Sequence, residues 1–299
     1  MLRTMRISVK LAIIYMLILF VSWMMIFFLF AGIRSRESRN YAKALSAQTL
    51  NTVGRNVSTI IDNAAYYSRI ILSSSEVTGA LEAGDGERQK ESLYQFISLV
   101  DSETHINGIY MWDMHDHACS IDRNHVRSLR TENVSGTNWY EEVMALGGSY
   151  CLKLNADRVL TQSSAQTCVS LIRVVNNPFD YQPVGILMIN IDLEAFVGCY
   201  ESVDAQSVPC LYILDQTGKI VASRSEITLP EFQAALASGR ESFLYGDRKV
   251  FPASLEADGI DWVILAGTVT ENSLDKSAAG GFLVATVIIS LALFCFDAL

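Results

Sequence analysis

A charge-free apolar stretch near the N-terminus, residues 11–33, constrains this chain more than any other feature. It runs for 23 positions without a charged residue, and about 20 apolar residues in a helix match the ~30 Å hydrocarbon core of a bilayer. The sequence that follows, beginning Arg34-Ser35-Arg36, contains no small-residue cleavage site of the kind that ends a signal peptide. The sequence therefore predicts an uncleaved transmembrane helix over residues 11–33.

A second charge-free stretch covers residues 277–296, directly after Asp275 and Lys276. Its length also suits a crossing of the bilayer, and we expect a second transmembrane helix over residues 277–297. Half of all residues in the chain are hydrophobic, which fits a protein with two lipid-facing helices. The chain between the spans, residues 34–276, is then the main folded domain.

The charges of the chain are unevenly distributed. Residues 34–275 contain 19 Lys and Arg against 31 Asp and Glu, whereas residues 1–10 carry only Arg3, Arg6 and Lys10. Short basic ends tend to stay in the cytoplasm, so we expect a cytoplasmic N-terminus, two spans in the cell membrane and an extracytoplasmic main domain. An acidic domain of this kind is not suited to nucleic acid.

The region after the first span continues as a helix. No proline occurs between residue 34 and about residue 75, and apolar residues recur at steps of three and four, which places them on one face. Such a stripe is favoured to pack against its own domain, although it could also be the seam of a dimer. A Gly-Asp-Gly turn then precedes a predicted helix over residues 86–101, so residues 34–104 form a helical stalk. The stripe consists of Leu50, Val53, Val57, Ile60, Ala64, Tyr67 and Ile71.

Beyond residue 104 the apolar pattern becomes that of strands. Residues 106–114 and 118–121 read as a hairpin, and a helix over residues 138–148 follows an N-cap-like Ser135-Gly136-Thr137 and ends at Gly147-Gly148. Three further strands lead to a helix that starts at Asp192. These three strands are expected at residues 149–155, 167–175 and 184–191.

A second, smaller module is expected over residues 207–270. It begins with a hairpin at residues 209–225, in which Gly218 suits a left-handed turn position. A helix over residues 229–239 and strands over residues 241–251 and 261–269 complete it. The predicted fold class is α+β, with two PAS-like antiparallel-sheet modules in series on a long N-terminal helix, flanked by two transmembrane helices.

Short motifs in this order resemble the double-Cache (dCache) sensor domain of bacterial membrane receptors. NWYEEVMALGG is similar to the Trp-Tyr helix of the membrane-distal module, here residues 105–200, and VGILMINIDLEAF to its last strand and exit helix. LYILDQTGKIVAS resembles the first hairpin of the membrane-proximal module, and RISVKLAIIYMLIL the first span of sensor histidine kinases with extracellular Cache domains. The resemblance implies a sensor that binds a small molecule in the distal module.

The resemblance also indicates which residues face the ligand. Trp139 and Tyr140 match the aromatic pair of the Trp-Tyr helix. In the amino-acid-binding members, an Arg two residues before the Trp holds the ligand carboxylate, and an Asp on the last strand holds its ammonium group. The corresponding residues here are Thr137 and Asn190, which offer only neutral hydrogen bonds. We therefore expect a neutral polar solute, such as a sugar, in preference to an α-amino acid.

Four other residues are candidates for the same pocket. Tyr110 and Trp112 could form aromatic walls beside Asn190, together with the Trp-Tyr pair. Alternatively, Trp112 and Trp139 could simply be core aromatics of a sheet and helix interface. Arg173 could anchor an anion, or could extend to the surface. Asp192 could contact the ligand, or could serve as the N-cap of the following helix.

The segment MHDHACSIDRNH raises the alternative of a metal site. His115, His117 and Cys119 alternate, so on a strand they would point to one face and could hold zinc or copper; in a turn they would simply be solvated. Of the cysteines, Cys151 and Cys168 form the first pair to test for a disulfide, the alternative being small buried hydrophobic residues. We predict no cofactor.

The sequence contains no catalytic motif: a nucleophile elbow, a P-loop, HExxH and a dinucleotide fingerprint are all absent. We expect no enzymatic activity in this chain, and a signalling output, most simply of the histidine kinase type, beyond residue 299 or on a partner. Signalling through two thin spans favours a homodimer. The rival hypotheses are a metal-binding or redox-sensing exterior domain and a structural membrane-anchored interaction module.

Overall fold

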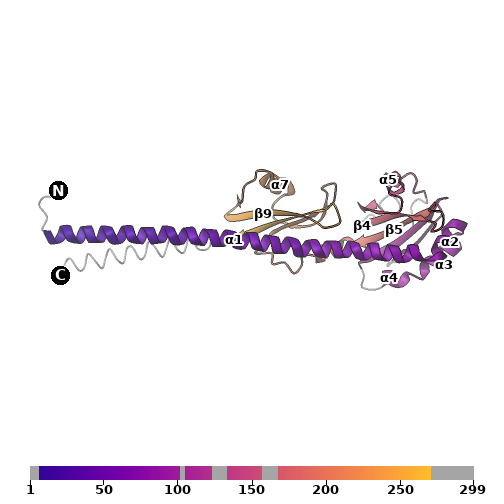
Figure 1. Cartoon of the computed structure of the whole chain (residues 1–299), viewed down its shortest axis with the longest axis horizontal. Coiled ribbons are helices and arrows are strands. Elements are labelled where there is room, and N and C mark those ends of the chain that lie inside the picture. The colour runs from indigo at the N-terminus through magenta and orange to yellow at the C-terminus, as the bar shows by residue number, and fades with distance from the viewer. Residues whose placement is uncertain (1–6, 102–104, 123–132, 157–167, 271–299) are drawn as a thin grey trace. The chain divides into compact units, whose positions relative to one another are not determined.

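The computed structural model describes residues 7–101, 105–122, 133–156 and 168–270. In these ranges the chain is α+β, with a long N-terminal helix followed by two five-stranded sheets in series (Figure 1). The predicted class of helix and sheets is thus confirmed. The predicted second span, residues 277–297, lies outside the described residues.

The first helix, α1, runs from Ile7–Ser73 without interruption, as the absence of proline predicted. Its N-terminal part is apolar and its large side chains there are exposed, among them Ile14, Phe20 and Phe30. This part of α1 is long and apolar enough to cross a membrane, and among the described residues it is the single helix of that kind.

The predicted apolar stripe of α1 packs against the chain's own domain. Leu50, Val53, Val57, Ala64 and Ile71 are all buried. Ile60 and Tyr67, at the margin of the stripe, are partly exposed. The favoured interpretation of this stripe is therefore confirmed, because its central side chains are already covered within one chain.

The helices after α1 are shorter than predicted. The sequence pattern suggested one helix over residues 86–101, but the chain forms α3 (Gly86–Tyr94) and α4 (Ile97–Asp101), with a turn between them. A further helix, α2 (Ser75–Ala83), was not anticipated; extended backbone at Ser74 separates it from α1. The Asp85 carboxylate caps α3 by accepting hydrogen bonds from the N–H groups of Glu87 and Arg88.

The first sheet has the strand order β2-β1-β5-β4-β3, and all its pairs are antiparallel. Its strands lie close to the predicted positions. They are β1 (Ile106–Asp113), β2 (Ala118–Asp122), β3 (Tyr150–Leu154), β4 (Cys168–Asn176) and β5 (Pro183–Asp192).

Two short helices accompany this sheet, α5 (Tyr140–Ala145) and α6 (Leu193–Gly198). Asp192 caps α6 by accepting from the N–H of Glu194. The predicted cap of α5 was wrong, because Trp139 occupies the N-cap position, and Thr137 instead donates its hydroxyl to the carbonyl of Val134. Thr137 thereby closes the turn that leads into α5.

The second sheet has the order β7-β6-β10-β9-β8. Gly218 adopts φ +77° in the first turn, as expected for a left-handed position. The single strand predicted over residues 241–251 is in fact part of a hairpin, since Gly246 takes φ +58° between a three-residue strand and a nine-residue strand. The elements are β6 (Cys210–Leu214), β7 (Ile220–Ser225), α7 (Leu229–Ala237), β8 (Phe243–Tyr245), β9 (Arg248–Glu256) and β10 (Val263–Thr270).

The strand register rules out the disulfide considered between Cys151 and Cys168. Cys151 lies opposite Ile172, four residues along β4 from Cys168, so the two cysteines are about 13 Å apart along the strands. A disulfide requires Cα atoms within about 7 Å. Cys119, Cys151, Cys168, Cys199 and Cys210 are all free thiols.

The thiols give a direct test of this register. Alkylation under denaturing conditions, without a reductant, is expected to modify both Cys151 and Cys168 in full, since neither is oxidised. Mass spectrometry of the corresponding peptides would measure this. A linked pair of peptides that separates only after reduction would contradict the register.

Candidate functional site

The register of the first sheet divides its side chains between two faces. Opposite pairs share a face, and in β1 and β5 the pairs Tyr110 with Met188 and Trp112 with Ile186 define one of them. The pair of Ile172 with Met188 extends this face to β4. We call it the α5 face, because Trp139 and Val143, at the start of α5 and within it, pack against the same residues.

An apolar cluster covers part of the α5 face, and the predicted aromatic residues meet there. Tyr110 and Trp112 stack with ring centroids 6.1 Å apart and 15° between their planes. Trp139 is buried in the same cluster, and Tyr140 packs against its edge. The buried members are Tyr110, Trp112, Val134, Trp139, Val143, Ala156, Ile172, Val174, Ile186 and Met188.

A row of polar side chains crosses the sheet at one end of this cluster. Ser170, Asn190, Gly108 and Asp122 are register partners on adjacent strands and so share the α5 face. Ser170 donates its hydroxyl to Oδ1 of Asn190 at 2.7 Å, and both side chains are fully buried. The Tyr110 hydroxyl reaches across to Oδ2 of the buried Asp122 at 3.0 Å. Asn190 therefore lies on β5, on the same face of the sheet as Tyr110 and Trp112.

Two indole groups in the cluster are buried without a hydrogen-bond acceptor among the residues that the structure describes. Trp112 is 0% and Trp139 is 2% exposed, and within the described ranges neither Nε1–H group has a hydrogen-bond partner. The contrast is Trp262 in the second sheet, which is equally buried but donates its Nε1–H to Oε1 of Gln216 at 3.1 Å. Buried indole N–H groups usually find an acceptor.

Arg173 lies on the opposite face of the sheet and does not join the group. Its guanidinium donates to Oγ of Ser68 on α1 at 3.1 Å and to the carbonyl of Gly148. Burial, together with the nearby Arg69, lowers the pKa of Arg173. Asp192 is partly buried and caps α6, which is the alternative that the sequence offered for it.

His115 and His117 lie in a turn rather than on a strand. Residues 114–117 connect β1 to β2, and Asp116 adopts φ +65° there. The Asp113 carboxylate holds this turn. Its Oδ1 accepts hydrogen bonds from the backbone N–H groups of His115 and His117 at 2.8 and 2.9 Å, and its Oδ2 lies 2.8 Å from Nδ1 of His117. The alternating arrangement that the metal hypothesis required is therefore wrong.

No group of three or more metal-ligating side chains occurs among the residues that the structure describes. Cys119, the third candidate, is buried, and burial together with Asp113 raises the pKa of its thiol to about 12. Burial likewise raises the pKa values of Cys151 and Cys199 to about 11. These thiols are protonated at neutral pH, so they are poor ligands and poor redox sensors.

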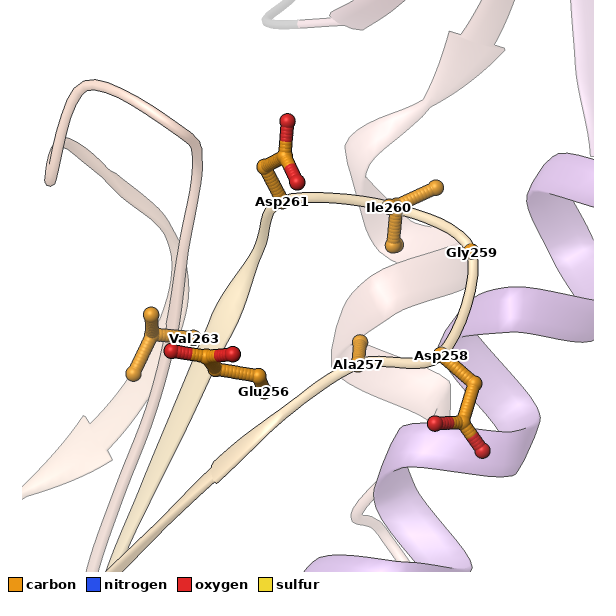
Figure 2. A pocket seen from close by; sticks show the side chains of 7 residues that line it. All are labelled: Glu256, Ala257, Asp258, Gly259, Ile260, Asp261 and Val263. Carbon is orange, nitrogen blue, oxygen red and sulfur yellow. The ribbon is translucent and has the colours of Figure 1, made fainter.

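A hollow of about 560 Å³ lies at the turn between β9 and β10 (Figure 2). Figure 2 shows the side chains of Asp258 and Asp261 pointing away from each other on opposite sides of this turn. Ala257 donates its N–H to the carbonyl of Trp262 at 2.9 Å, so the hollow belongs to an ordinary hairpin turn. It contains none of the predicted site residues.

Comparisons with solved structures bear on the fold. The ligand-binding domain of the Campylobacter jejuni chemoreceptor Tlp3, in complex with L-norvaline, matches with a TM-score of 0.57 at 12% identity, over 78% of this chain and 92% of that one. The extracellular domain of vpHK1S-Z8, described as a histidine kinase, matches with a TM-score of 0.57 at 14% identity, over 79% and 97%. The chain has the fold of these sensory domains.

A third sensory domain supports the same conclusion. The ligand-binding domain of the Pseudomonas fluorescens chemoreceptor CtaA, in complex with L-alanine, matches with a TM-score of 0.50 at 12% identity, over 79% of this chain and 99% of that one. No protein-family model and no curated protein matches the chain. The resemblance to Cache-type sensor domains that the motifs suggested is thus confirmed at the level of fold.

Asp122 and Ser170 belong to the candidate site on the α5 face, but sequence reasoning did not assign them to it. Asp122 lies in the segment MHDHACSIDRNH, which was analysed only as a possible metal site, and Ser170 was not singled out. Both are register partners of residues on the α5 face. A period of two predicts which residues of one strand share a face, but not which residues of two strands lie opposite each other.

Proposed function

We propose that this chain is a membrane-anchored extracytoplasmic sensor that binds a small solute on the α5 face of its first sheet. The observation that carries the proposal is the pair of buried polar contacts on that face, Ser170 with Asn190 and Tyr110 with Asp122. A core that only stabilises the fold is cheaper to build from apolar residues, because buried polar groups cost free energy. Polar groups beside an apolar, aromatic floor are typical of small-molecule sites.

We further propose that the solute is neutral and polar. Solved neighbours hold amino acids such as L-alanine and L-valine. In this chain, Thr137 and Asn190 stand where the amino-acid-binding members have charged side chains, and Thr137 uses its hydroxyl in a local turn. Without charge-assisted bonds, an α-amino acid loses its main anchors. An amino acid ligand is the second candidate, supported by those neighbours.

The proposal includes a location and a route for the signal. Residues 11–33 and 277–297 would cross the cell membrane, with a cytoplasmic N-terminus and residues 34–276 outside. Residues 105–200 would form the membrane-distal module and residues 207–270 the membrane-proximal one. Ligand binding would shift the equilibrium between two arrangements of the spans in a homodimer, and a histidine kinase-type output would respond to it.

The proposal is tested by binding to the full chain in detergent micelles. We expect D-glucose, D-galactose, D-xylose or myo-inositol to raise the unfolding temperature, because a ligand that binds only the folded state stabilises it. L-alanine, L-valine and propanoate form the comparison set, and zinc and copper test the metal hypothesis.

Asn190→Leu provides the matched variant, because it removes the polar contact at nearly constant volume. It should abolish the shift in unfolding temperature while the chain remains folded. A shift with L-valine alone would replace the neutral solute with an amino acid. No shift with any solute would favour a structural module and reject the sensor.

A further inference from the structure

The two indole N–H groups without an acceptor carry an inference about the ligand. Trp112 is on β1 and Trp139 is at the N-cap of α5, so the two donors come from the two elements that enclose the cluster. A buried donor without an acceptor is costly, and the cost recurs for each such group. Two such groups within one cluster are unusual in a region that is otherwise apolar.

We infer that Trp112 and Trp139 donate hydrogen bonds to neutral oxygen atoms of the bound solute, and that this pair replaces the missing arginine. This inference rests on the proposed function. It differs from the simpler view of the two residues as flat aromatic walls, because the N–H group rather than the ring face then decides which solutes bind. The ligand class is a neutral compound with hydroxyl, ether or carbonyl oxygens, as in a monosaccharide.

The charges on the α5 face argue against a carboxylate at the same place. Asp122 is a buried carboxyl group on this face. Among the described strand residues whose side chains share the face, Lys153 is the one cation, and its Nζ lies 2.5 Å from Oε2 of Glu142 on α5. A carboxylate held only by neutral donors in apolar surroundings would lose its hydration without a compensating charge. A neutral oxygen avoids this penalty.

The hydrogen bonds can be observed on the full chain in detergent micelles, labelled with 15N-tryptophan. Trp112→Phe, Trp139→Phe and Trp262→Phe assign these three of the chain's four indole N–H signals by their loss. On saturation with whichever of D-glucose, D-galactose, D-xylose or myo-inositol binds, the Trp112 and Trp139 protons should move downfield. The Trp262 proton should stay in place, since that group already donates to Gln216.

Affinity gives the second measurement. Trp112→Phe and Trp139→Phe should each weaken binding roughly tenfold, as expected for the loss of one hydrogen bond, and Trp262→Phe should leave it unchanged. Because phenylalanine also leaves a void, incorporation of benzothienylalanine at residue 112 or 139 separates the two effects. That side chain keeps the ring shape and lacks the N–H, so it should weaken binding while leaving the free protein at least as stable.

The outcomes distinguish this inference from the proposed function. If a sugar binds but the indole signals and the affinities of the variants do not change, the donor role is overturned and the sensor stands. If L-valine or propanoate binds through the two indoles, the neutral class is overturned. If no probe binds, the proposed function fails, and the inference fails with it.

Discussion

Replacing Gly185 by alanine is expected to destabilise the first sheet by about 3 kcal/mol, at the upper end of the usual cost of overpacking. Gly185 lies on β5 opposite Asp113 of β1 and Val175 of β4. A Cβ atom at this position would lie 2.4 Å from the carbonyl oxygen of Trp112 and about 3.1 Å from a methyl group of Leu81. The nearest obstacle is backbone in the middle of the sheet, so it cannot rotate away as a side chain could.

The change is best measured by urea unfolding of the full chain in detergent micelles, followed by circular dichroism. Gly79→Ala is the matched control, because Gly79 lies within α2 and a Cβ there would meet no atom within 4 Å. Alanine in a helix interior is favoured over glycine, so this variant should be more stable by about 0.5–1 kcal/mol. Equal behaviour of the two variants would show that β5 does not approach β1 as described.

Gly185→Ala should also weaken solute binding, since the strand segment that must move carries Trp112. We expect the loss of affinity to exceed that of a destabilised variant elsewhere in the chain with the same free energy of unfolding. A binding titration at a temperature where both variants are fully folded would measure it. An unchanged affinity would mean that β1 accommodates the added methyl without displacing the cluster.

Asp113→Ala is expected to lower the free energy of unfolding by about 3 kcal/mol, which is similar to the loss expected for Gly185→Ala. The Asp113 carboxylate is buried. It accepts hydrogen bonds from two backbone N–H groups of the β1–β2 turn and from the side-chain amide of Gln89 at 3.0 Å, and it also contacts the ring of His117. Its removal leaves the buried Gln89 amide and the turn N–H groups without their acceptor, each at a cost of about 1–3 kcal/mol, partly recovered by water. Thermal unfolding would measure this loss.

The contribution of Asp113 should depend on pH. Burial by itself raises the pKa of this carboxyl, but the hydrogen bonds from His117, Gln89 and His115 outweigh it and hold the pKa below its usual value. A carboxyl with a lowered folded-state pKa stabilises the protein above its unfolded pKa, near 3.9, and this stabilisation is lost as the pH falls through the folded pKa.

A pair of asparagine variants isolates this effect. Asp113→Asn resembles the protonated acid, so the stability difference between the wild type and this variant should be largest at neutral pH and should shrink below about pH 4. Asp261→Asn, at an exposed turn position, should show little difference at any pH. A difference for Asp113→Asn that stays constant down to pH 3 would contradict the lowered pKa.

Most elements of the fold could be predicted from periodicity and turn residues. The stripe from Leu50 to Ile71 gave the buried face of α1, and alternating apolar residues located β1, β4 and β5. The errors occurred where local signals compete. The break between α3 and α4 has no glycine or proline to mark it, and Gly246 lies within a segment that alternates like one strand.

The candidate site was only partly predictable, for a different reason. Trp139, Tyr140 and Asn190 could be placed by their positions within motifs, and the structure brings them to one cluster or to one face. Arg173 shows the limit, because its own strand pattern does not reveal which face carries α1. Face assignment depends on the pairing of strands distant in sequence, and no property of one strand specifies its partner.

The free thiols determine how this domain can be produced. Since every cysteine in the described part of the chain is unlinked and most are buried, the domain reaches its final shape without an oxidase or a disulfide isomerase. Its assembly is therefore indifferent to the presence of oxygen. A cell that lives without air could fold it as readily as one that lives in air, and a laboratory host with a reducing cytosol could supply it for the binding experiments.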